Sequence, residues 1–171
     1  MEKTGGQMKK FYIMETSLGK GIFAVRSIKR NEEILRFKGP IVTGKQGMKL
    51  DFERFGKRLG NSLQIKKDRY IYLEDPGRLV NHSCKPNSGI KEDKTLVAIR
   101  NIKKGEEIRY DYSTTIDEDD WSMKCKCGEK NCRKIIKDFR YLPKKIREKY
   151  LKLGIVQKFI SKKFNKKPED R

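Results

Sequence analysis

Hydrophobic residues in the first 115 positions occur in short runs that alternate with polar residues or are rich in β-branched and aromatic side chains. Glycine, proline and charged turn residues separate these runs, a pattern typical of short strands joined by turns. We predict strands within KFYIMET (10–16), SLGKGIFAV (17–25), EEILRFKGPIV (32–42), RYIYLED (69–75), TLVAIRNI (95–102) and EIRYDYS (107–113), the last of which closes the series.

Two further segments do not follow this strand pattern. The stretch GKQGMKLDFERFGKRLGNS (44–62) is polar and glycine-punctuated, which predicts a partly helical insert between strands. After Cys132 the hydrophobic period becomes helical: Pro143 suits the first turn of a helix, and Gly154 suits its C-terminal cap. The end, KKFNKKPEDR (162–171), is predicted to fray. The second helix is predicted to carry Val156, Phe159, Ile160 and Phe164.

Charge adds a prediction about partners. The 171 residues carry a formal net charge of +20, and 39% of them are charged. Residues 133–171 alone hold 15 Lys or Arg against 4 Asp or Glu, whereas the one acidic stretch is IDEDDW (116–121). Such a balance predicts attraction to a polyanion or a nucleic-acid-associated partner through the basic tail. No sequence feature indicates an oligomeric state.

The sequence shows no sign of a membrane or secretory destination. No apolar run approaches the roughly 18 residues of a spanning helix, and the N-terminus lacks a hydrophobic stretch of signal-peptide type. We therefore expect no membrane contact, no classical secretion, and a cytoplasmic or nuclear (nucleoid-associated) location. In such reducing compartments, clustered cysteines bind metal more often than they form disulfides.

The four cysteines predict a zinc site. Cys125, Cys127 and Cys132 form C-x-C-x4-C, and Cys84 lies 41 residues before the first of them. Structural zinc takes four tetrahedral ligands, so three local cysteines require a fourth from elsewhere. Cys84 completes the count with none left over. Two alternatives stay open: His82 is the fourth ligand and Cys84 is free, or the thiols bind no metal.

Four motifs occur in the order seen in SET-domain protein lysine methyltransferases. GKGIFAVRSIKRNEEI (19–34) resembles the family's first glycine motif and RLVNHSCKPN (78–87) its central motif. GEEIRYDYS (105–113) resembles its tyrosine-containing segment, and CKCGEKNC (125–132) its post-SET zinc module. Two departures are Leu79, where the family often has an aromatic residue, and Arg133-Lys134, where it usually has Arg-Gly.

The resemblance covers about residues 11–134 and implies both fold and activity. It implies a compact, mainly β fold of small curved sheets with short helices and a knot-like C-terminal threading. The implied division is a SET domain at 8–116, a post-SET zinc segment at 121–137 and a basic helical tail at 138–171. S-adenosylmethionine is the implied methyl donor, a protein lysine the acceptor, and Cys84 the fourth zinc ligand.

Tyrosine roles also follow from the resemblance. Tyr112 is the implied catalytic tyrosine, with a plain core tyrosine as the alternative. Tyr110 stands at a position that varies between Phe and Tyr in the family, and a tyrosine there predicts mainly monomethyllysine. Tyr70 and Tyr72 are candidates for the same channel, or for plain strand packing.

The implied cofactor clamp comes from two motifs and also includes Tyr112. Asn81 and His82 meet the cofactor, with Arg78 just upstream; the alternative for His82 is a core imidazole. Gly21 with the backbone of its neighbours serves the same ligand, unless this segment is an ordinary turn. The glycine-motif residues concerned are Lys20, Gly21 and Phe23.

Two features near the cysteines have open interpretations. Trp121 either borders the cofactor or peptide groove or simply packs, and the acidic run 117–120 either selects a basic peptide or is a solvated loop. A rival reading of the whole chain is a non-catalytic, zinc-containing, basic protein that binds nucleic acid or chromatin. That reading leaves the NHSC and YDY segments unexplained.

Overall fold

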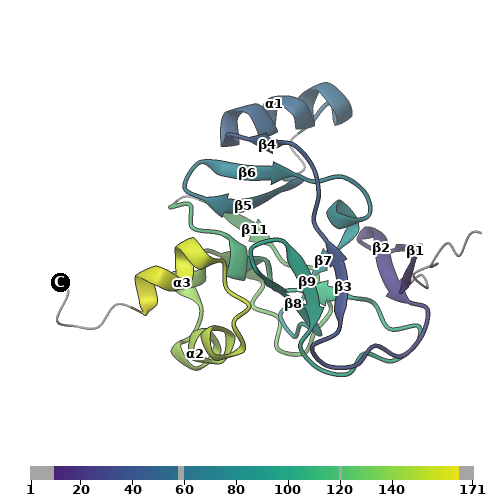
Figure 1. Ribbon diagram of the computed structural model, residues 1–171. Helices are drawn as coiled ribbons and strands as arrows, with labels where there is room; N and C mark the ends of the chain where they lie inside the picture. Colours follow the sequence, from purple (N-terminus) through teal and green to yellow (C-terminus); the bar gives the residue numbers. More distant parts are fainter. Residues whose placement is uncertain (1–9, 58–59, 120, 166–171) are drawn as a thin grey trace, which may run out of the picture.

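The computed structural model describes residues 10–57, 60–119 and 121–165, and within them the strands form five small sheets (Figure 1). The strands are β1 (Phe11–Thr16), β2 (Gly19–Ala24), β3 (Glu33–Arg36), β4 (Ile41–Val42), β5 (Ser62–Lys66), β6 (Arg69–Tyr72), β7 (Asn81–His82), β8 (Ser88–Lys91), β9 (Thr95–Ala98), β10 (Arg109–Tyr110), β11 (Ser122–Lys124) and β12 (Ile135–Lys137). The helices are α1 (Gly44–Phe55), α2 (Lys144–Leu153) and α3 (Lys158–Phe164), with 3₁₀ turns η1 (Gly77–Leu79), η2 (Tyr112–Thr115) and η3 (Phe139–Tyr141). The predicted mainly β fold of small sheets is confirmed.

Two antiparallel three-stranded sheets, in the orders β3-β9-β8 and β4-β6-β5, lie beside the β1–β2 hairpin. Their tight turns use residues that tolerate positive φ, such as Asp68 between β5 and β6 and Asp93 between β8 and β9. Apolar side chains from all three units meet in one core, which supplies the main hydrophobic stabilisation. Its fully buried members include Ile22, Leu63, Ile71, Ile90, Leu96 and Ile108.

The segments that carry the central motifs pair at the middle of the molecule. β7 and β10 run parallel, with Asn81 opposite Arg109 and His82 opposite Tyr110. Parallel neighbours need a long connection, and here β8 and β9 lie in it. The knot-like threading of the C-terminal segment stays a prediction.

The predicted helical insert forms as α1, which covers the β4-β6-β5 sheet at the top of Figure 1. Thr43 starts α1 with a capping box: its hydroxyl accepts the Gln46 N–H, and the Gln46 side chain accepts the Thr43 N–H. Gly56 ends the helix in the left-handed conformation at φ 67°. The last residue of the predicted insert, Ser62, belongs to β5 instead.

The strand series does not close at residue 113, contrary to the sequence prediction. β11 and β12 pair antiparallel on either side of the cysteine segment, and their three-residue length gave too weak a pattern to read. The two predicted C-terminal helices are present, but each begins later in the chain than the sequence predicted. Pro143 precedes α2 as its N-cap, and Val156 lies before α3, whereas Gly154 caps α2 as expected.

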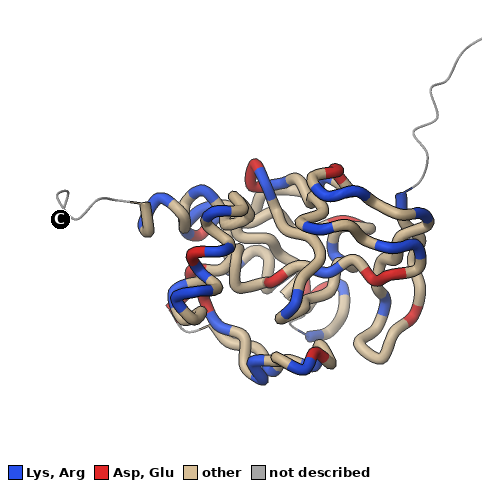
Figure 2. Tube along the Cα trace, turned by 90° about the horizontal axis from the view of Figure 1, so that it is seen from below, with Lys and Arg blue, Asp and Glu red and all other residues tan. Residues whose placement is uncertain are grey.

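The two C-terminal helices dock through a second apolar cluster, and the basic residues stay outside. Phe139, Leu142, Tyr150, Ile155, Val156 and Ile160 are buried in that cluster. Lys and Arg positions occur along the whole trace, including both helices, in Figure 2. The predicted frayed end lies partly outside the described residues, from 166 onward. Within the described ranges, every helix is too short or too polar to cross a membrane.

Candidate active site and metal centre

The pairing of β7 with β10 brings the two central motifs into direct contact. The Ser83 N–H donates to the Tyr110 carbonyl at 3.0 Å. The Tyr112 hydroxyl donates to the Val80 carbonyl at 2.9 Å, immediately before Asn81. The implied catalytic tyrosine and the implied cofactor clamp are therefore neighbours in space, although 30 residues separate them in sequence.

Tyr110 and Tyr112 form an aromatic pair, with ring centroids 4.9 Å apart. Tyr110 is buried and hydrogen-bonds Thr115, whereas Tyr112 is partly buried. Burial raises the pKa of both phenols well above the usual value, and nearby Glu107 adds to the increase at Tyr112. Both hydroxyls are therefore neutral at physiological pH and available as hydrogen-bond donors and acceptors.

The glycine motif meets the central motif at Asn81. Its side-chain amide donates to Glu107 Oε1 at 2.8 Å and to the Lys20 carbonyl at 3.2 Å. A Cβ at Gly21 would lie 2.6 Å from Glu107 Oε1 and 3.1 Å from Asn81 Nδ2, so a side chain here would displace the Glu107 carboxylate from its bond with Asn81. The structure thus brings Lys20, Gly21 and Asn81 together. Sequence reasoning missed Glu107, which accepts the Asn81 amide and lies next to Gly21.

The other two predicted cofactor residues lie differently. Phe23 is buried in β2 and stacks on Tyr12, with centroids 5.7 Å apart. Arg78 pairs with Asp75 at 2.5 Å, and its guanidinium lies 5.6 Å from the Phe55 ring centroid. Arg78 is therefore turned toward the end of α1, away from the contacts of Asn81.

His82 is buried, and its hydrogen bonds define its tautomer. Burial lowers its pKa to about 4, although the nearby charge of Asp111 opposes the shift, so the ring is neutral at pH 7. Nδ1 accepts the Tyr112 backbone N–H at 3.1 Å, which leaves the proton on Nε2. Nε2 then donates to Cys84 Sγ at 3.4 Å.

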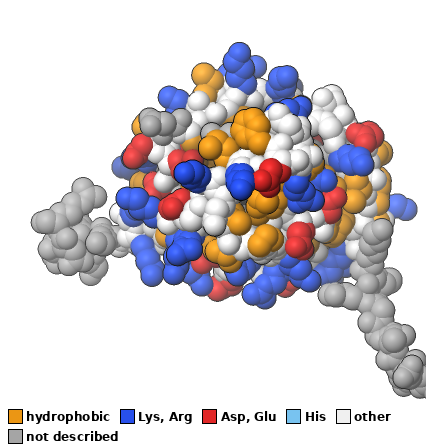
Figure 3. Space-filling view, turned by 90° about the horizontal axis from the view of Figure 1, so that it is seen from above, with side chains coloured by type: hydrophobic (Ala, Val, Ile, Leu, Met, Phe, Trp, Pro, Cys, Tyr) orange, Lys and Arg blue, Asp and Glu red, His pale blue; other side chains and the backbone are white. Residues whose placement is uncertain are grey.

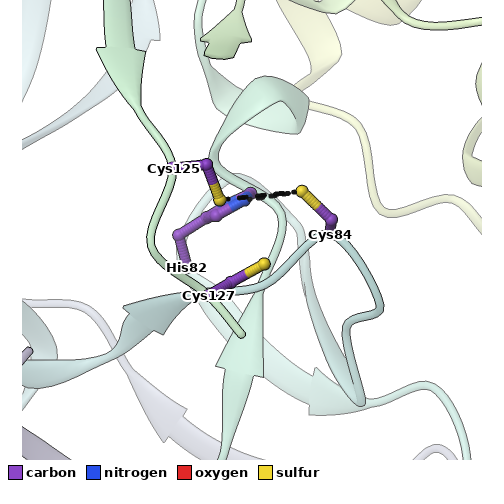
Figure 4. A group of neighbouring side chains, drawn as sticks. All are labelled: His82, Cys84, Cys125 and Cys127. Carbon is purple, nitrogen blue, oxygen red and sulfur yellow. Dashed lines mark hydrogen bonds between the residues drawn. The ribbon is translucent and has the colours of Figure 1, made fainter. Parts of the chain in front are cut away.

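Figure 4 shows His82, Cys84, Cys125 and Cys127 pointing toward one another. Their ligand atoms all lie within 4.8 Å of one another, and Cys84 Sγ is 3.8 Å from Cys125 Sγ. Cys132 packs against the same group, and its thiol hydrogen-bonds those of Cys125 and Cys127. All four cysteines therefore converge, and all are free thiols.

The sulfur atoms are surrounded by backbone donors that suit thiolates. The N–H groups of Arg133 and Lys134 donate to Cys84 Sγ and Cys132 Sγ, each at 3.4 Å. Burial raises the pKa of Cys84 to about 11 and also raises that of Cys125, whereas at Cys127 the N–H groups of Cys84 and Glu129 outweigh burial and lower the pKa to about 7. Zinc requires deprotonated thiols, and N–H groups that stabilise them are a favourable environment for such ligands.

Asp111, between the two tyrosines, is a hub that sequence reasoning missed. Its side chain is fully buried and accepts both Arg133 nitrogens at 2.6 and 2.7 Å, the Tyr150 hydroxyl at 3.1 Å and the Ser113 N–H at 3.1 Å. It therefore ties the cysteine segment and α2 to the tyrosine turn. A charged residue in an apolar strand pattern was the available signal.

A second ion pair clamps the cysteine loop to β10. Arg109 donates to the Cys127 carbonyl at 2.9 Å and to Glu129 Oε1 at 2.7 Å. The Ser83 hydroxyl also donates to Glu129, at 3.2 Å. The ion pair of Arg109 with Glu129 and the hydrogen bond from Ser83 thus hold the NHSC segment, β10 and the cysteine loop together. The contact between the Cys84 and Cys125 thiols joins the same segments.

Two of the remaining aromatic candidates line a cavity beside α1, and the third, Tyr72, contacts one of its lining residues. Tyr70 and Trp121 line it together with Glu118, and Trp121 also packs against the cysteine cluster. The Tyr72 hydroxyl donates to buried Asp51 at 3.2 Å. Tyr70 bonds to Glu118 and Tyr72 to Asp51, and the predicted place of both in the channel of Tyr112 stays a prediction.

This geometry defines a SET-type fold, and the sequence comparison agrees with it. A model of the SET domain matches residues 19–113, more than half of the chain, and the chain belongs to the SET-domain family. It is 33% identical over 129 residues to histone-lysine N-methyltransferase set-2 of Caenorhabditis elegans, covering 67% of this chain. It is 28% identical over 130 residues to human histone-lysine N-methyltransferase 2B, covering 69% of this chain.

Those relatives are much longer proteins, of which the chain spans 8% and 5%. Among solved structures, the methyltransferase domain of human SETMAR resembles this fold with a TM-score of 0.53 at 20% identity, covering 75% of this chain and 58% of that one. A chain of the ctPRC2 complex bound to S-adenosylmethionine gives a TM-score of 0.53 at 20% identity, covering 64% of this chain and 16% of that one. Both likenesses support the fold.

Proposed function

We propose that this protein is an S-adenosylmethionine-dependent protein-lysine N-methyltransferase. The observation that carries the proposal is the parallel β7–β10 pair, which sets Asn81 and His82 beside Tyr110 and Tyr112 in a chain of the SET-domain family. Relatives named histone-lysine N-methyltransferases and a structural neighbour bound to S-adenosylmethionine support it. A histone-like, lysine-bearing protein is the proposed substrate class, in a reducing compartment that keeps the cysteines as thiols.

Bound S-adenosylmethionine would supply an electrophilic methyl group on a positively charged sulfonium. Asn81, with the neighbouring Lys20 carbonyl, is the proposed polar contact of the cofactor, and Gly21 allows close backbone approach. The Tyr112 hydroxyl donates a hydrogen bond to the Val80 carbonyl, and its oxygen lone pairs stay available as acceptors. Those lone pairs orient a neutral lysine amine and accept weak C–H hydrogen bonds from the methyl.

The acceptor lysine must lose its proton before transfer, because its usual pKa is about 10.4. Tyr112 does not act as the base at neutral pH, since burial keeps it protonated. We therefore assign the deprotonation to solvent, assisted by the apolar surroundings of the two tyrosine rings, which disfavour an ammonium group.

For the metal, we propose zinc bound by Cys84, Cys125, Cys127 and Cys132. The tautomer of His82 favours this set over the one with histidine. A metal at Nε2 would displace its proton and require a hydrogen on Nδ1, which faces the Tyr112 N–H. His82 instead donates Nε2–H to Cys84 sulfur, the role of an outer partner that orients a metal ligand.

For the product, we propose mainly monomethyllysine. The Tyr110 hydroxyl lies next to the Tyr112 ring and adds a polar group that can hold a water near the acceptor. A methylated amine must displace that water, which is costly if its hydrogen bonds are not replaced. Tyr110→Phe is expected to increase di- and trimethyllysine at a similar first-transfer rate. Trimethyllysine as the main wild-type product would contradict the assignment.

For partners, we propose that the basic tail binds nucleic acid. Tyr141 is 57% exposed and lies between Lys137 and Arg140, 5.4 and 5.1 Å from its ring centroid. An exposed ring framed by cations suits base stacking next to phosphate. Exposed lysines on α2 extend this charge. The triple variant Lys145/Lys149/Lys152→Gln should reduce the slope of log affinity against log salt for duplex DNA by about 3, and an unchanged slope would remove the proposal.

The activity is tested with S-adenosylmethionine that carries an isotope-labelled methyl group. Incubation with core histones and with lysine peptides, followed by mass spectrometry, should place the label on a lysine side chain. Isothermal titration with unlabelled cofactor separates the enzyme from a non-catalytic nucleic-acid-binding protein. Absence of cofactor binding by the zinc-loaded protein would favour that rival.

A further inference from the structure

A cavity of about 300 Å³ lies between α1, the β5–β6 hairpin and the loop that follows η2. Its walls combine aromatic rings from Tyr70 and Trp121 with carboxylates from Asp51 and Glu118. The Asp51 carboxylate is buried and accepts the Gly60 N–H at 2.8 Å and the Asn61 amide at 3.0 Å. The cavity is therefore both aromatic and acidic, in a chain of net charge +20.

Glu118 is distinct from its two acidic neighbours. Asp117 pairs with Lys163 and Asp119 pairs with Arg140. Among the described residues, Glu118 has no cation within ion-pair distance, and it accepts a hydrogen bond from the Tyr70 hydroxyl at the cavity wall. The carboxylate that lines the cavity is thus the one of the three whose charge the described chain does not neutralise.

Glycines leave space in the wall that α1 contributes. Gly44 and Gly47 line the cavity, although glycine is disfavoured in helices relative to alanine. A Cβ at Gly47 would lie 2.9 Å from Ser62 Oγ, and a Cβ at Gly44 would lie 3.4 Å from the Tyr70 ring. Side chains here would narrow the cavity. The α1 face in Figure 3 shows acidic and apolar side chains interspersed among the basic ones.

We propose that this cavity binds an arginine side chain of the substrate, a few residues from the methylated lysine. A guanidinium matches all its features, because its planar faces stack on Trp121 or Tyr70 and its N–H groups bond to Glu118. Glu118 is six positions after Tyr112, a span of at most about 20 Å, which an extended peptide covers with about six residues. The inference rests on the proposed methyltransferase function and adds its sequence specificity.

The test uses lysine-centred peptides in an alanine–serine background, with one arginine moved from six residues before the lysine to six after it. For wild type, we expect one or two arginine positions to increase kcat/KM about tenfold over the arginine-free peptide, mainly through KM. Glu118→Gln should remove that preference and leave the arginine-free peptide unchanged. Asp119→Asn removes a neighbouring charge outside the cavity lining and should keep the preference.

Direct titration of the preferred peptide, in the presence of S-adenosylhomocysteine, gives a second readout that does not require turnover. If no peptide is methylated but arginine-dependent binding is lost in Glu118→Gln, the proposed function fails and the subsite stands. If peptides are methylated without any arginine preference, the subsite fails and the function stands. An equal loss on every peptide in Glu118→Gln would also overturn the subsite, because it would indicate a general defect.

Discussion

The active centre and the C-terminal helices are held in place by different forces. In the centre, charges meet directly: buried Asp111 pairs with partly buried Arg133, and Arg109 pairs with Glu129, both partly buried. In the C-terminal segment, apolar side chains such as Ile155 and Ile160 are buried, and the lysines of α2 and α3 are exposed. The two regions meet where the Tyr150 hydroxyl donates to Asp111.

Because of this difference, substitutions in the active centre and substitutions of the exposed lysines should have different effects on stability. Buried ion pairs lose several kcal/mol when one partner is removed, because the other charge stays without compensation. Exposed lysines can be replaced with a change of roughly 0.5 kcal/mol or less in the free energy of unfolding. Changes in the centre should therefore affect stability and catalysis together, whereas changes on the tail surface should affect binding alone.

The largest expected effect is loss of the metal from the centre. Cys132→Ser should reduce zinc affinity by more than about a hundredfold, because loss of an outer partner alone typically costs about tenfold to a hundredfold. It should also weaken cofactor binding, since metal binding and folding are coupled. Elemental analysis of the purified protein and a competition titration with a chelator measure the stoichiometry and the affinity.

His82→Gln is the matched variant that distinguishes the two ligand sets. It should keep one zinc per chain with a smaller loss of affinity, because His82 is an outer partner of Cys84. Cobalt substitution reports the number of thiolate ligands through its absorption spectrum. A four-thiolate spectrum that persists in Cys132→Ser, or disappears in His82→Gln, would contradict the assignment.

The next effect concerns the hub of the centre. Asp111→Asn leaves Arg133 partly buried without its anion, and we expect a loss of about 3–5 kcal/mol in the free energy of unfolding. Tyr150→Phe removes one hydrogen bond to the same carboxylate and should cost about 1 kcal/mol. Urea denaturation of the zinc-loaded proteins measures both, and equal losses would show that the ion pair is not the dominant contact.

A smaller effect is expected at the border of the two regions, where Asp138 is buried just before η3. Burial raises its pKa to about 6, with Asp117, Glu118 and Asp119 adding to the increase against the opposing charge of Arg140. The folded state therefore holds the proton more tightly than the unfolded chain, whose aspartate pKa is about 3.9. Stability that is present below pH 4 is lost as the pH rises through 6.

Asp138→Asn stays neutral over this range and should remove that loss. We expect the free energy of unfolding of the variant to exceed that of wild type by about 2–3 kcal/mol at pH 7.5, with little difference near pH 4. Chemical denaturation of both proteins at each pH gives the difference. An advantage that is the same at both pH values would show that hydrogen bonding, not ionisation, is responsible.

Sequence patterns predicted most of the longer elements of the fold, because periodicity requires several residues. They missed β5 and β8, whose five and four residues follow polar, turn-rich segments. The six strand-containing runs, the helical part of the insert and the two C-terminal helices all have enough positions to show it. β7, β11 and β12 have only two or three residues, and their formation depends on partners distant in sequence. The approach of β7 to β10 depends on tertiary packing that no local pattern contains.

The site residues, too, were predictable where a local sequence pattern marks them and not where their role depends on tertiary contacts. The cysteines and the NHSC and YDY segments were evident, because residue type and spacing carry their chemistry. Glu107, Asp111 and Arg133 were not, because an ordinary-looking acid or base becomes important only when burial brings its partner close. The cofactor contact suggested by the position of Arg78 in its motif stays a prediction; in the structure its side chain contacts Asp75 and Phe55.

Tyr112→Phe gives the most direct test of the claim that the buried centre performs methyl transfer. The substitution removes one hydroxyl and its bond to the Val80 carbonyl, and it keeps the ring that packs against Tyr110. Single-turnover methylation of one peptide and titration of S-adenosylmethionine should be measured on the same preparations. We predict a rate at least about a hundredfold lower, with a cofactor dissociation constant within about threefold of wild type. A near wild-type rate would contradict the account and leave Tyr112 as a core residue.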